Sequence, residues 1–378
     1  MTVRVVCGET VTGRILATVP TTEDGISWET ILNDAGTVDA TVPLRRIPER
    51  ERRNLLSYLE PNRCYLAAIT DSGKVLEAGP IWKHKLDDTS GDLTVGASGL
   101  WSIFDHRKAI DPSWDTGTAR VQDTQLRWSG MNLGSIAQYL TFSSLQRVGG
   151  VLPVLFQDIP DTGLAERTYP GYELGWVGER LRQLAEVSNG PDIAFEPRLT
   201  ADELGIEWVM RVGTDVDPLL HQRGADWRWD RCATRGTLKL LTVDVDATGV
   251  AQRAWSIGSG METELLLGVA QDLTPLDAGY PLLETDTSST NTSLQTTLNA
   301  QATSALAVAK RPWSTWSIEV RDDVPPLGDY RPGDWSSISV PDEHVYLRAG
   351  EYRTRILSIA GTGKSTVSVK LAPTMELR

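Results

Sequence analysis

Cysteine and histidine are both scarce in this chain, and their scarcity excludes several kinds of site. The 3 cysteines are Cys7, Cys64 and Cys232, and the 4 histidines are His84, His106, His221 and His344. An odd, widely spaced set of cysteines forms neither a disulfide framework nor a zinc cluster, so we interpret them as reduced, buried thiols. The histidines lack metal-ligand spacing, and no HExxH motif occurs. We therefore expect no metal site and no bound cofactor.

Long apolar runs are also missing. The run from Leu265 to Ala270 is among the longest, and it is far shorter than the ~20 residues that a membrane-spanning helix needs. The N-terminal stretch MTVRVVCGET has no apolar core of the kind found in secretion signals. We expect a protein that is synthesised in the cytoplasm and has no membrane span.

Basic residues are outnumbered, with 37 Lys and Arg against 50 Asp and Glu and a formal net charge of −13. Such a chain repels phosphate groups, which argues against tight binding of nucleic acid but not against DNA passing by without binding.

Phe is rare at 4 residues, whereas Trp reaches 13, Gly 33 and Pro 20. This composition favours many short strands joined by turns, and the length suffices for about two to four compact units.

Residues 1–110 have the pattern of a β-domain. The segment Thr37–Leu44 alternates apolar and polar residues with a period of two, as a half-buried strand does. Similar segments lie on both sides of it, with hairpin turns at Asp71–Gly73 and Thr89–Gly91. About six or seven short strands in this range predict a first β-barrel.

Helical periodicity begins in the next range, residues 111–225. Asn132 can cap a helix that carries an apolar stripe with the 3.6-residue spacing. A second helix starts near Val177, and Asn189-Gly190 supplies the left-handed residues that can end it. Strands follow at 192–196 and 205–212. We predict an α/β insertion domain with a small core of its own.

Strands return after residue 226, and Val250–Ile257 is one of them. A long helix can be capped by Thr292 or Ser293, and Pro312 terminates it. The final residues again alternate as strands. We therefore predict a second β-barrel made of residues 226–260 and 311–378, with a helical insertion at 261–310. The predicted fold class is β-rich α+β, with two related β-barrel domains and two insertions.

The stretch Gly361–Thr366, GTGKST, resembles the end of a phosphate-binding loop. That motif needs a glycine where this chain has Ser358, and its lysine should open a helix that meets the phosphates. Residues 366–371 instead alternate like a strand. We predict a hairpin turn and no nucleotide site.

The stretch Asp244–Gly249 resembles the start of a calcium-binding loop. Trp255 stands where that loop needs a bidentate Glu, so we predict a strand, a turn and a strand here instead.

No catalytic residue emerges from the sequence. A G-x-S-x-G elbow is absent, and the cysteines and histidines form no local nucleophile–base pair. A pair of carboxylates suited to glycoside hydrolysis stays open as a possibility, because such pairs assemble only in three dimensions.

Most tryptophans lie in strand patterns and are expected in cores. Trp313 and Trp316, which follow the long helix, are candidate subunit-interface aromatics.

The order of these parts resembles the baseplate hub proteins of tailed bacteriophages, and in particular hub-type minor tail proteins of long-tailed phages that infect actinobacteria. It is also similar to the hubs of contractile tails. The resemblance spans nearly the whole chain and is carried by loose patterns at Ile26–Asn33, Ala40–Leu44, Ala78–Trp82, Leu93–Val95, Gly99–Trp101, Arg107, Tyr330–Asp334, Arg355–Leu357 and Val367–Leu371.

This resemblance implies a virion protein of the tail tip without enzymatic activity. It implies a homotrimer whose paired barrels form a ring between the tail tube with its distal tail protein and the tip fibres. The tape measure protein and then DNA would pass through the lumen unbound, past a wall that we expect to be acidic. Other minor tail or fibre proteins would complete the tip, and any lysin activity would belong to another chain. The alternatives are a β-rich cell-wall hydrolase and a carbohydrate-binding tail adhesin.

Overall fold

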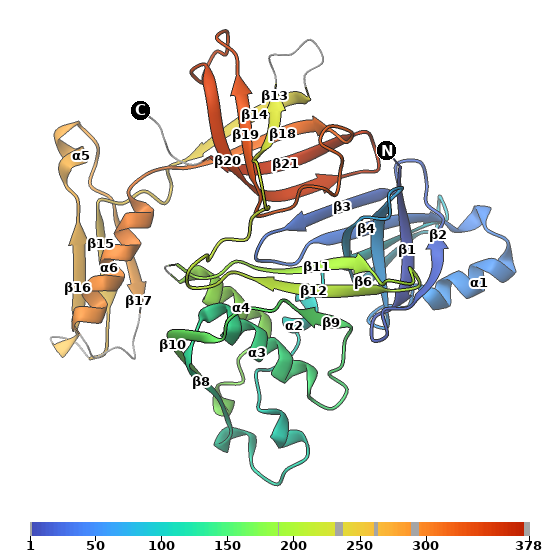
Figure 1. Ribbon diagram of the computed structural model, residues 1–378, viewed down its shortest axis with the longest axis horizontal. Coiled ribbons are helices and arrows are strands. Elements are labelled where there is room, and N and C mark those ends of the chain that lie inside the picture. Colours follow the sequence, from blue (N-terminus) through green and yellow to red (C-terminus); the bar gives the residue numbers. More distant parts are fainter. Residues whose placement is uncertain (1, 188, 231–236, 261–263, 289–294, 374–378) are drawn as a thin grey trace. The chain divides into compact units, whose positions relative to one another are not determined.

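The computed structural model describes residues 2–187, 189–230, 237–260, 264–288 and 295–373 (Figure 1). Cys232 and the predicted helix caps Thr292 and Ser293 lie outside the described residues. The chain forms two compact units, one made of Met1–Leu241 with Ser317–Arg378 and the other of Thr242–Trp316. Within the described residues, no helix combines the length and the apolar character needed to cross a bilayer.

The larger unit is built on a 13-stranded sheet. Its first half contains β1 (Val3–Glu9), β2 (Ile15–Val19), β3 (Ile26–Ile31), β4 (Thr37–Pro43), β5 (Cys64–Thr70), β6 (Val75–Asp87) and β7 (Asp92–Ser98). Its second half contains β13 (Trp227–Asp230), β14 (Leu238–Asp246), β18 (Trp313–Arg321), β19 (Trp335–Val340), β20 (Gly350–Gly361) and β21 (Thr366–Pro373). The β-rich class predicted from the sequence is confirmed.

The two predicted barrels are halves of one continuous sheet. The strand order is β14-β18-β21-β20-β3-β4-β7-β6-β5-β1-β2, with β19 also paired to β20 and β13 to β19. The halves meet where β3 and β20 pair antiparallel, with Ile31 opposite Ser358 and Trp28 opposite Gly361. We call this pairing the seam. It joins residues near the start of the chain to residues near its end.

Helix α1 (Glu49–Tyr58) lies within the first half, between β4 and β5. Between the two halves in the sequence lie α2 (Trp101–Phe104), α3 (Leu133–Leu145), α4 (Val177–Glu186) and a smaller sheet. The small sheet contains β9 (Val154–Phe156), β11 (Ile193–Leu199) and β12 (Ile206–Val212), and β8 (Gln125–Met131) forms a ribbon with β10 (Thr162–Pro170). The predicted cap at Asn132 is confirmed, because its side chain accepts a hydrogen bond from the Ser135 N–H. The end of α4 agrees only in part: its C-cap is the extended residue Val187, and of the predicted pair Asn189-Gly190 only Asn189 has a positive φ, 57°.

The α/β insertion shares its core with the first half of the sheet, so the prediction of a separate small core is wrong. Ile136, Leu181 and Trp208 of the insertion pack in one buried cluster with Tyr65 and Ala78 of the sheet. The Trp208 Nε1–H donates to the Ala78 carbonyl at 3.0 Å, and its ring meets Tyr65 edge to face at 5.7 Å. Sequence spacing shows that Trp208 is a buried strand residue, but it does not show which part of the chain packs against its ring.

The smaller unit is a three-stranded sheet with one helix across it. Its strands follow the order β16 (Leu267–Gln271), β15 (Arg253–Ile257) and β17 (Glu284–Ser288). The helix α6 (Gln295–Ala309) packs on all three strands. A short helix, α5 (Thr274–Asp277), lies between β16 and β17 in the sequence. The sequence predicts β15 as a strand of the second barrel, and this prediction is wrong. The strand pairs instead with β16 and β17, because an alternating pattern identifies a strand but not its partner.

Candidate functional site

One face of the large sheet carries short polar and charged side chains across both halves. Successive side chains along a strand point to opposite faces, so the pairing register assigns each residue to a face. Ser27 lies opposite Asp39, Asp39 opposite Gly96 and Gly96 opposite Lys83. We call this surface the polar face; it comprises Ser27, Glu29, Thr37, Asp39, Thr41, Lys83, Lys85, Thr94, Glu319, Ser358, Thr366, Ser368 and Lys370.

Two hollows of about 480 and 420 Å³ lie on the polar face. The first is lined by residues of β3, β4, β18, β20 and β21, among them Glu29 and Glu319. The second is lined by β3, β4, β6 and β7, with Asp39 and Lys83 among its residues, and Ser27 borders both hollows. The two hollows are therefore neighbours at Ser27, and the first of them crosses the seam.

Acidic and basic groups are interleaved on this surface. The charged residues on the polar face and at its loops are Asp24, Glu29, Asp39, Glu319, Lys83, Lys85, Lys364 and Lys370. Lys364 Nζ lies 3.3 Å from Asp24 Oδ1, and Lys370 Nζ lies 3.6 Å from Glu29 Oε1. The Ser358 hydroxyl also donates to Glu29, at 3.0 Å. The chain's strong negative charge is therefore not concentrated here.

The seam is reinforced by a buried carboxylate that contacts three parts of the chain. Asp192, just before β11, forms an ion pair with Arg355 of β20, and their side chains are 6% and 14% exposed. It also accepts hydrogen bonds from the Leu220 N–H at 2.8 Å and from the Asn33 side-chain amide at 3.0 Å. Asn33 in turn accepts from the Ile193 N–H at 2.7 Å. One carboxylate thus links both halves of the sheet to the insertion.

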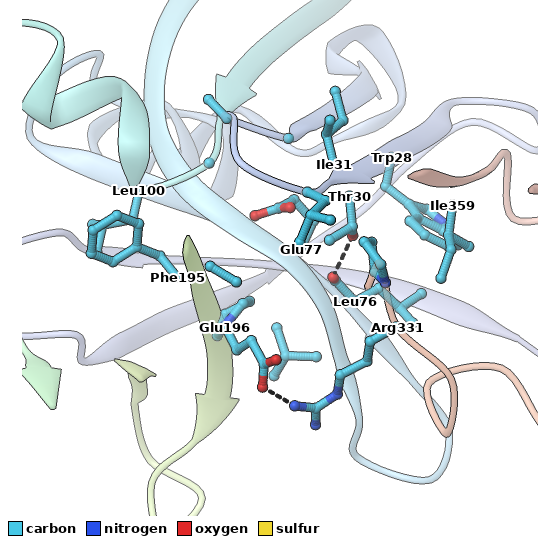
Figure 2. A pocket seen from close by; sticks show the side chains of 18 of the residues that line it. Trp28, Thr30, Ile31, Leu76, Glu77, Leu100, Phe195, Glu196, Arg331 and Ile359 are labelled. Carbon is cyan, nitrogen blue, oxygen red and sulfur yellow. Dashed lines mark hydrogen bonds and ion pairs between the residues drawn. The ribbon is translucent and has the colours of Figure 1, made fainter. Parts of the chain in front are cut away.

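A second acidic residue repeats this linkage from β11. Glu196 accepts from Arg211 of β12 at 2.7 Å and forms an ion pair with Arg331, in the segment that leads to β19 (Figure 2). The Glu196 side chain is 18% exposed, so water screens the pair only in part. The insertion is thereby fixed to the second half as well as to the first.

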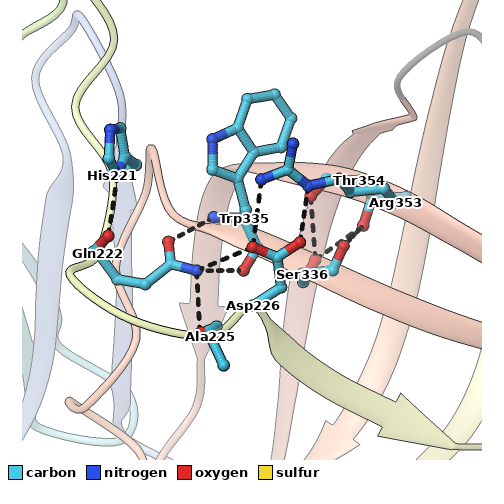
Figure 3. A network of polar contacts seen from close by, with 8 residues as sticks. All are labelled: His221, Gln222, Ala225, Asp226, Trp335, Ser336, Arg353 and Thr354. Carbon is cyan, nitrogen blue, oxygen red and sulfur yellow. Dashed lines mark hydrogen bonds and ion pairs between the residues drawn. The ribbon is translucent and has the colours of Figure 1, made fainter. Parts of the chain in front are cut away.

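The connection from the insertion to β13 is held by a polar network (Figure 3). The Gln222 side-chain amide donates to the Trp335 carbonyl at 3.1 Å and accepts from the Trp335 N–H at 2.8 Å, as a neighbouring strand would. Arg353 binds Asp226 through two hydrogen bonds of 2.6 and 3.2 Å, and its guanidinium lies 4.3 Å from the centre of the Trp335 ring. These side-chain contacts therefore hold the connection against the start of β19.

The stretch Gly361–Thr366 forms the turn between β20 and β21, as predicted. Gly363 has a φ of +71°, which a tight reversal requires. Gly361 has a different role, since a Cβ there would lie 2.8 Å from the Trp28 ring across the seam. The glycines thus serve the turn and the close packing of Trp28.

The structure separates the two predicted interface aromatics. Trp313 is 62% exposed, whereas Trp316 is 3% exposed and donates its Nε1–H to the Ser314 hydroxyl at 3.2 Å. The Trp316 ring is therefore already covered within the chain, and the interface role stays a prediction for Trp313. Among the described residues, no group of three or more His, Cys, Asp or Glu side chains is placed to hold a metal ion.

No protein-family model matches the sequence, and neither does any curated protein. Solved structures do match over almost the whole chain. A tail protein from Neisseria meningitidis is 15% identical, with a TM-score of 0.57, and covers 98% of this chain and 97% of its own. The 43 kDa tail protein of a Shewanella oneidensis prophage is 13% identical, with a TM-score of 0.58, and covers 99% and 98%.

A prophage tail protein from Listeria monocytogenes is also similar, at 11% identity and a TM-score of 0.52, and covers 99% of this chain and 95% of its own. Both halves of the sheet and both insertions fall within these matches, because each match spans nearly all of both chains. The chain therefore has the fold of these tail proteins, two of which come from prophages.

Proposed function

We propose that this protein is a structural component of a bacteriophage tail, located at the tail tip, where it acts as the hub. The observation that supports this proposal is the fold match to three tail proteins, two of them from prophages, each over nearly the full length of both chains. The role needs no reacting groups. It needs a rigid, continuous scaffold, and the seam with its buried carboxylate is suited to that need.

In this proposal three copies form a ring, and the polar face lines its channel. A surface of Ser, Thr and interleaved charges has little apolar area on which a passing polypeptide could adhere. It also carries no excess of positive charge that would hold DNA phosphates. We thus replace the expected acidic wall with a charge-balanced one, through which the tape measure protein and then DNA would pass.

The other surfaces would contact the remaining proteins of the tail. The distal tail protein would lie on the tube side of the ring, and fibre or other minor tail proteins would lie on the tip side. Trp313, at 62% exposure, is our candidate for the contact between subunits. Large exposed aromatic side chains are enriched in such interfaces.

The mass of the purified full chain, measured by light scattering and native mass spectrometry, tests this proposal. We expect a trimer, or a monomer that becomes trimeric when the distal tail protein is added, with ring-shaped particles in negative stain. Trp313→Arg should raise the dissociation constant of the trimer at least about tenfold. Tyr280→Arg, at a residue with the same exposure of 62%, provides the comparison.

A result of a different kind would overturn the proposal. A chain that stays monomeric beside the distal tail protein, and that cleaves purified cell-wall glycan, would be a hydrolase. A chain that stays monomeric and binds such glycan without cleavage would be an adhesin.

A further inference from the structure

A small cavity lies directly beneath the seam, where three parts of the larger unit meet (Figure 2). Its volume is about 70 Å³, which is enough for several water molecules. Its walls come from β3, β6, β11, the residues around Gly99 and the segment 327–332 of the second half. Any change inside it acts on both halves of the sheet and on the insertion.

Glu77 of β6 extends into this cavity and is only 4% exposed. The Ala78 N–H donates to Glu77 Oε1 at 3.0 Å. Two glycines make room for the carboxyl group. A Cβ at Gly36 would lie 2.1 Å from Oε2, and one at Gly99 would lie 3.1 Å from Oε1. The carboxyl group is thus enclosed by backbone on two sides.

No cation within the described residues forms an ion pair with Glu77. Four titratable side chains line the cavity around it, and each comes from a neighbouring segment: Asp34 after β3, Glu196 on β11, and Tyr330 and Arg331 in the segment 327–332. Arg331 is paired with Glu196, and Asp34 with Arg182. Lys74, just before β6, is paired with Asp329 at 3.2 Å. The cations near the cavity are therefore engaged by other carboxylates.

Two neighbouring groups oppose the effect of burial on this acid, because the Ala78 N–H and the Thr30 hydroxyl both lower the pKa of Glu77. Thr30 Oγ1 also donates to the Leu76 carbonyl at 2.8 Å. Burial is nevertheless the largest of these effects. Burial raises the pKa of Glu77 from 4.5 to about 8.

We propose that Glu77 is a protonated acid at neutral pH and that its proton controls the packing of β3 and the segment 327–332 over β6. When the proton leaves, an unpaired charge remains in a cavity that has room for only a few water molecules, and opening of the neighbouring segments lets more water reach that charge. The seam then becomes a proton-controlled joint between the two halves of the sheet. This inference concerns the larger unit by itself and does not rest on the proposed function.

The direction of the pH effect follows from the two pKa values. Between pH 4.5 and about 8, the opened or unfolded chain releases the Glu77 proton while the closed chain keeps it. The free energy of opening therefore falls as pH rises through this range and becomes level above pH 8. The opening constant should rise roughly tenfold for each pH unit within the range.

The test combines hydrogen exchange with a single substitution in the full chain. Amide exchange is followed by mass spectrometry from pH 5.5 to 9, corrected for intrinsic rates, in the wild type, Glu77→Gln and Glu49→Gln. Glu49 serves as the control because its side chain is 72% exposed. In the wild type and in Glu49→Gln, opening of residues 26–31 and 327–332 should increase about fiftyfold from pH 6 to pH 8. In Glu77→Gln it should stay level.

Equal pH dependence in the wild type and Glu77→Gln would overturn the proposal. If Glu77→Gln does not fold, the carboxyl carbon of Glu77 can be titrated by NMR in the wild type. An apparent pKa of 7 or higher supports the joint, and a value near 4.5 rules it out.

Discussion

Asp192 and Arg355 lie 163 residues apart in the sequence and form an ion pair that is largely withdrawn from solvent. Asp192 stands at the entrance to β11, and Arg355 lies on β20. Their contact fixes the insertion to the second half of the sheet, while Asn33 ties the same carboxylate to the end of β3. One charged pair therefore contributes to the relative positions of three parts of the larger unit.

Removing one member of this pair should be costly. Arg355→Met leaves Asp192 as a buried charge without its cation, so we expect a loss of about 3–5 kcal/mol in the free energy of unfolding. Arg228→Met is the matched control, because Arg228 and Glu351 are 64% and 57% exposed; its loss should stay below about 1 kcal/mol. Urea unfolding followed by tryptophan fluorescence measures both. Similar losses in the two variants would show that the buried pair has no special role.

Lys364 lies at the tip of a turn and pairs with exposed Asp24. Lys364→Ala should change the free energy of unfolding by less than about 1 kcal/mol and should leave assembly intact. Isothermal titration calorimetry with ATP and Mg²⁺ should give no binding heat in either the wild type or the variant. A measurable affinity that Lys364→Ala abolishes would restore the nucleotide-site interpretation.

Charge balance on the polar face can be tested in assembled particles. Asp39→Lys with Glu319→Lys makes this surface strongly basic, so DNA phosphates would be held during passage. We expect genome release per assembled particle to fall roughly tenfold at low salt and to recover at higher salt, where the attraction is screened. Asp39→Asn with Glu319→Gln, which removes the charges without reversing them, should release its genome nearly as well as the wild type. Unchanged release in the lysine variant would separate the polar face from the channel.

The two described cysteines should resist alkylation in the native protein. Burial raises the pKa of the Cys7 thiol to about 12, and burial likewise raises that of Cys64. Because the thiolate is the reacting form, iodoacetamide at pH 8 should modify both at least about a hundredfold more slowly than free cysteine. In urea both should react at ordinary rates. Mass spectrometry of the two peptides gives the rates, and rapid native modification of Cys7 would contradict its burial.

Local patterns in the sequence predicted the elements well. The helix cap at Asn132 and the turn at Gly361–Thr366 were found because a cap or a turn depends on a few neighbouring residues. The period of two identified most strands of both halves for the same reason. The amphipathic stripe located α4, on which Val177 and Leu181 are buried.

What the sequence could not supply was the identity of the partners. Nothing near Asp192 indicates that its carboxylate meets Arg355, and nothing near β15 indicates that it pairs with β16 rather than with the second half. Trp208 alternates like any strand residue, yet it fills a core that the first half shares. For Asn33 the sequence does contain a local signal, although it concerns the backbone and not the contact with Asp192. Asn33 has a φ of 60°, and Asn is a common residue for that backbone conformation just before a turn such as Asp34-Ala35-Gly36.

The seam also has a consequence for how this chain is made. On the ribosome, β3 emerges more than 300 residues before β20, its partner strand. Throughout that interval one edge of β3 lacks its native hydrogen-bonding neighbour, and an unpaired edge can recruit strands from other chains. The large sheet can be completed only after nearly all of the sequence has been synthesised, so its folding should be slow and sensitive to crowding among nascent chains.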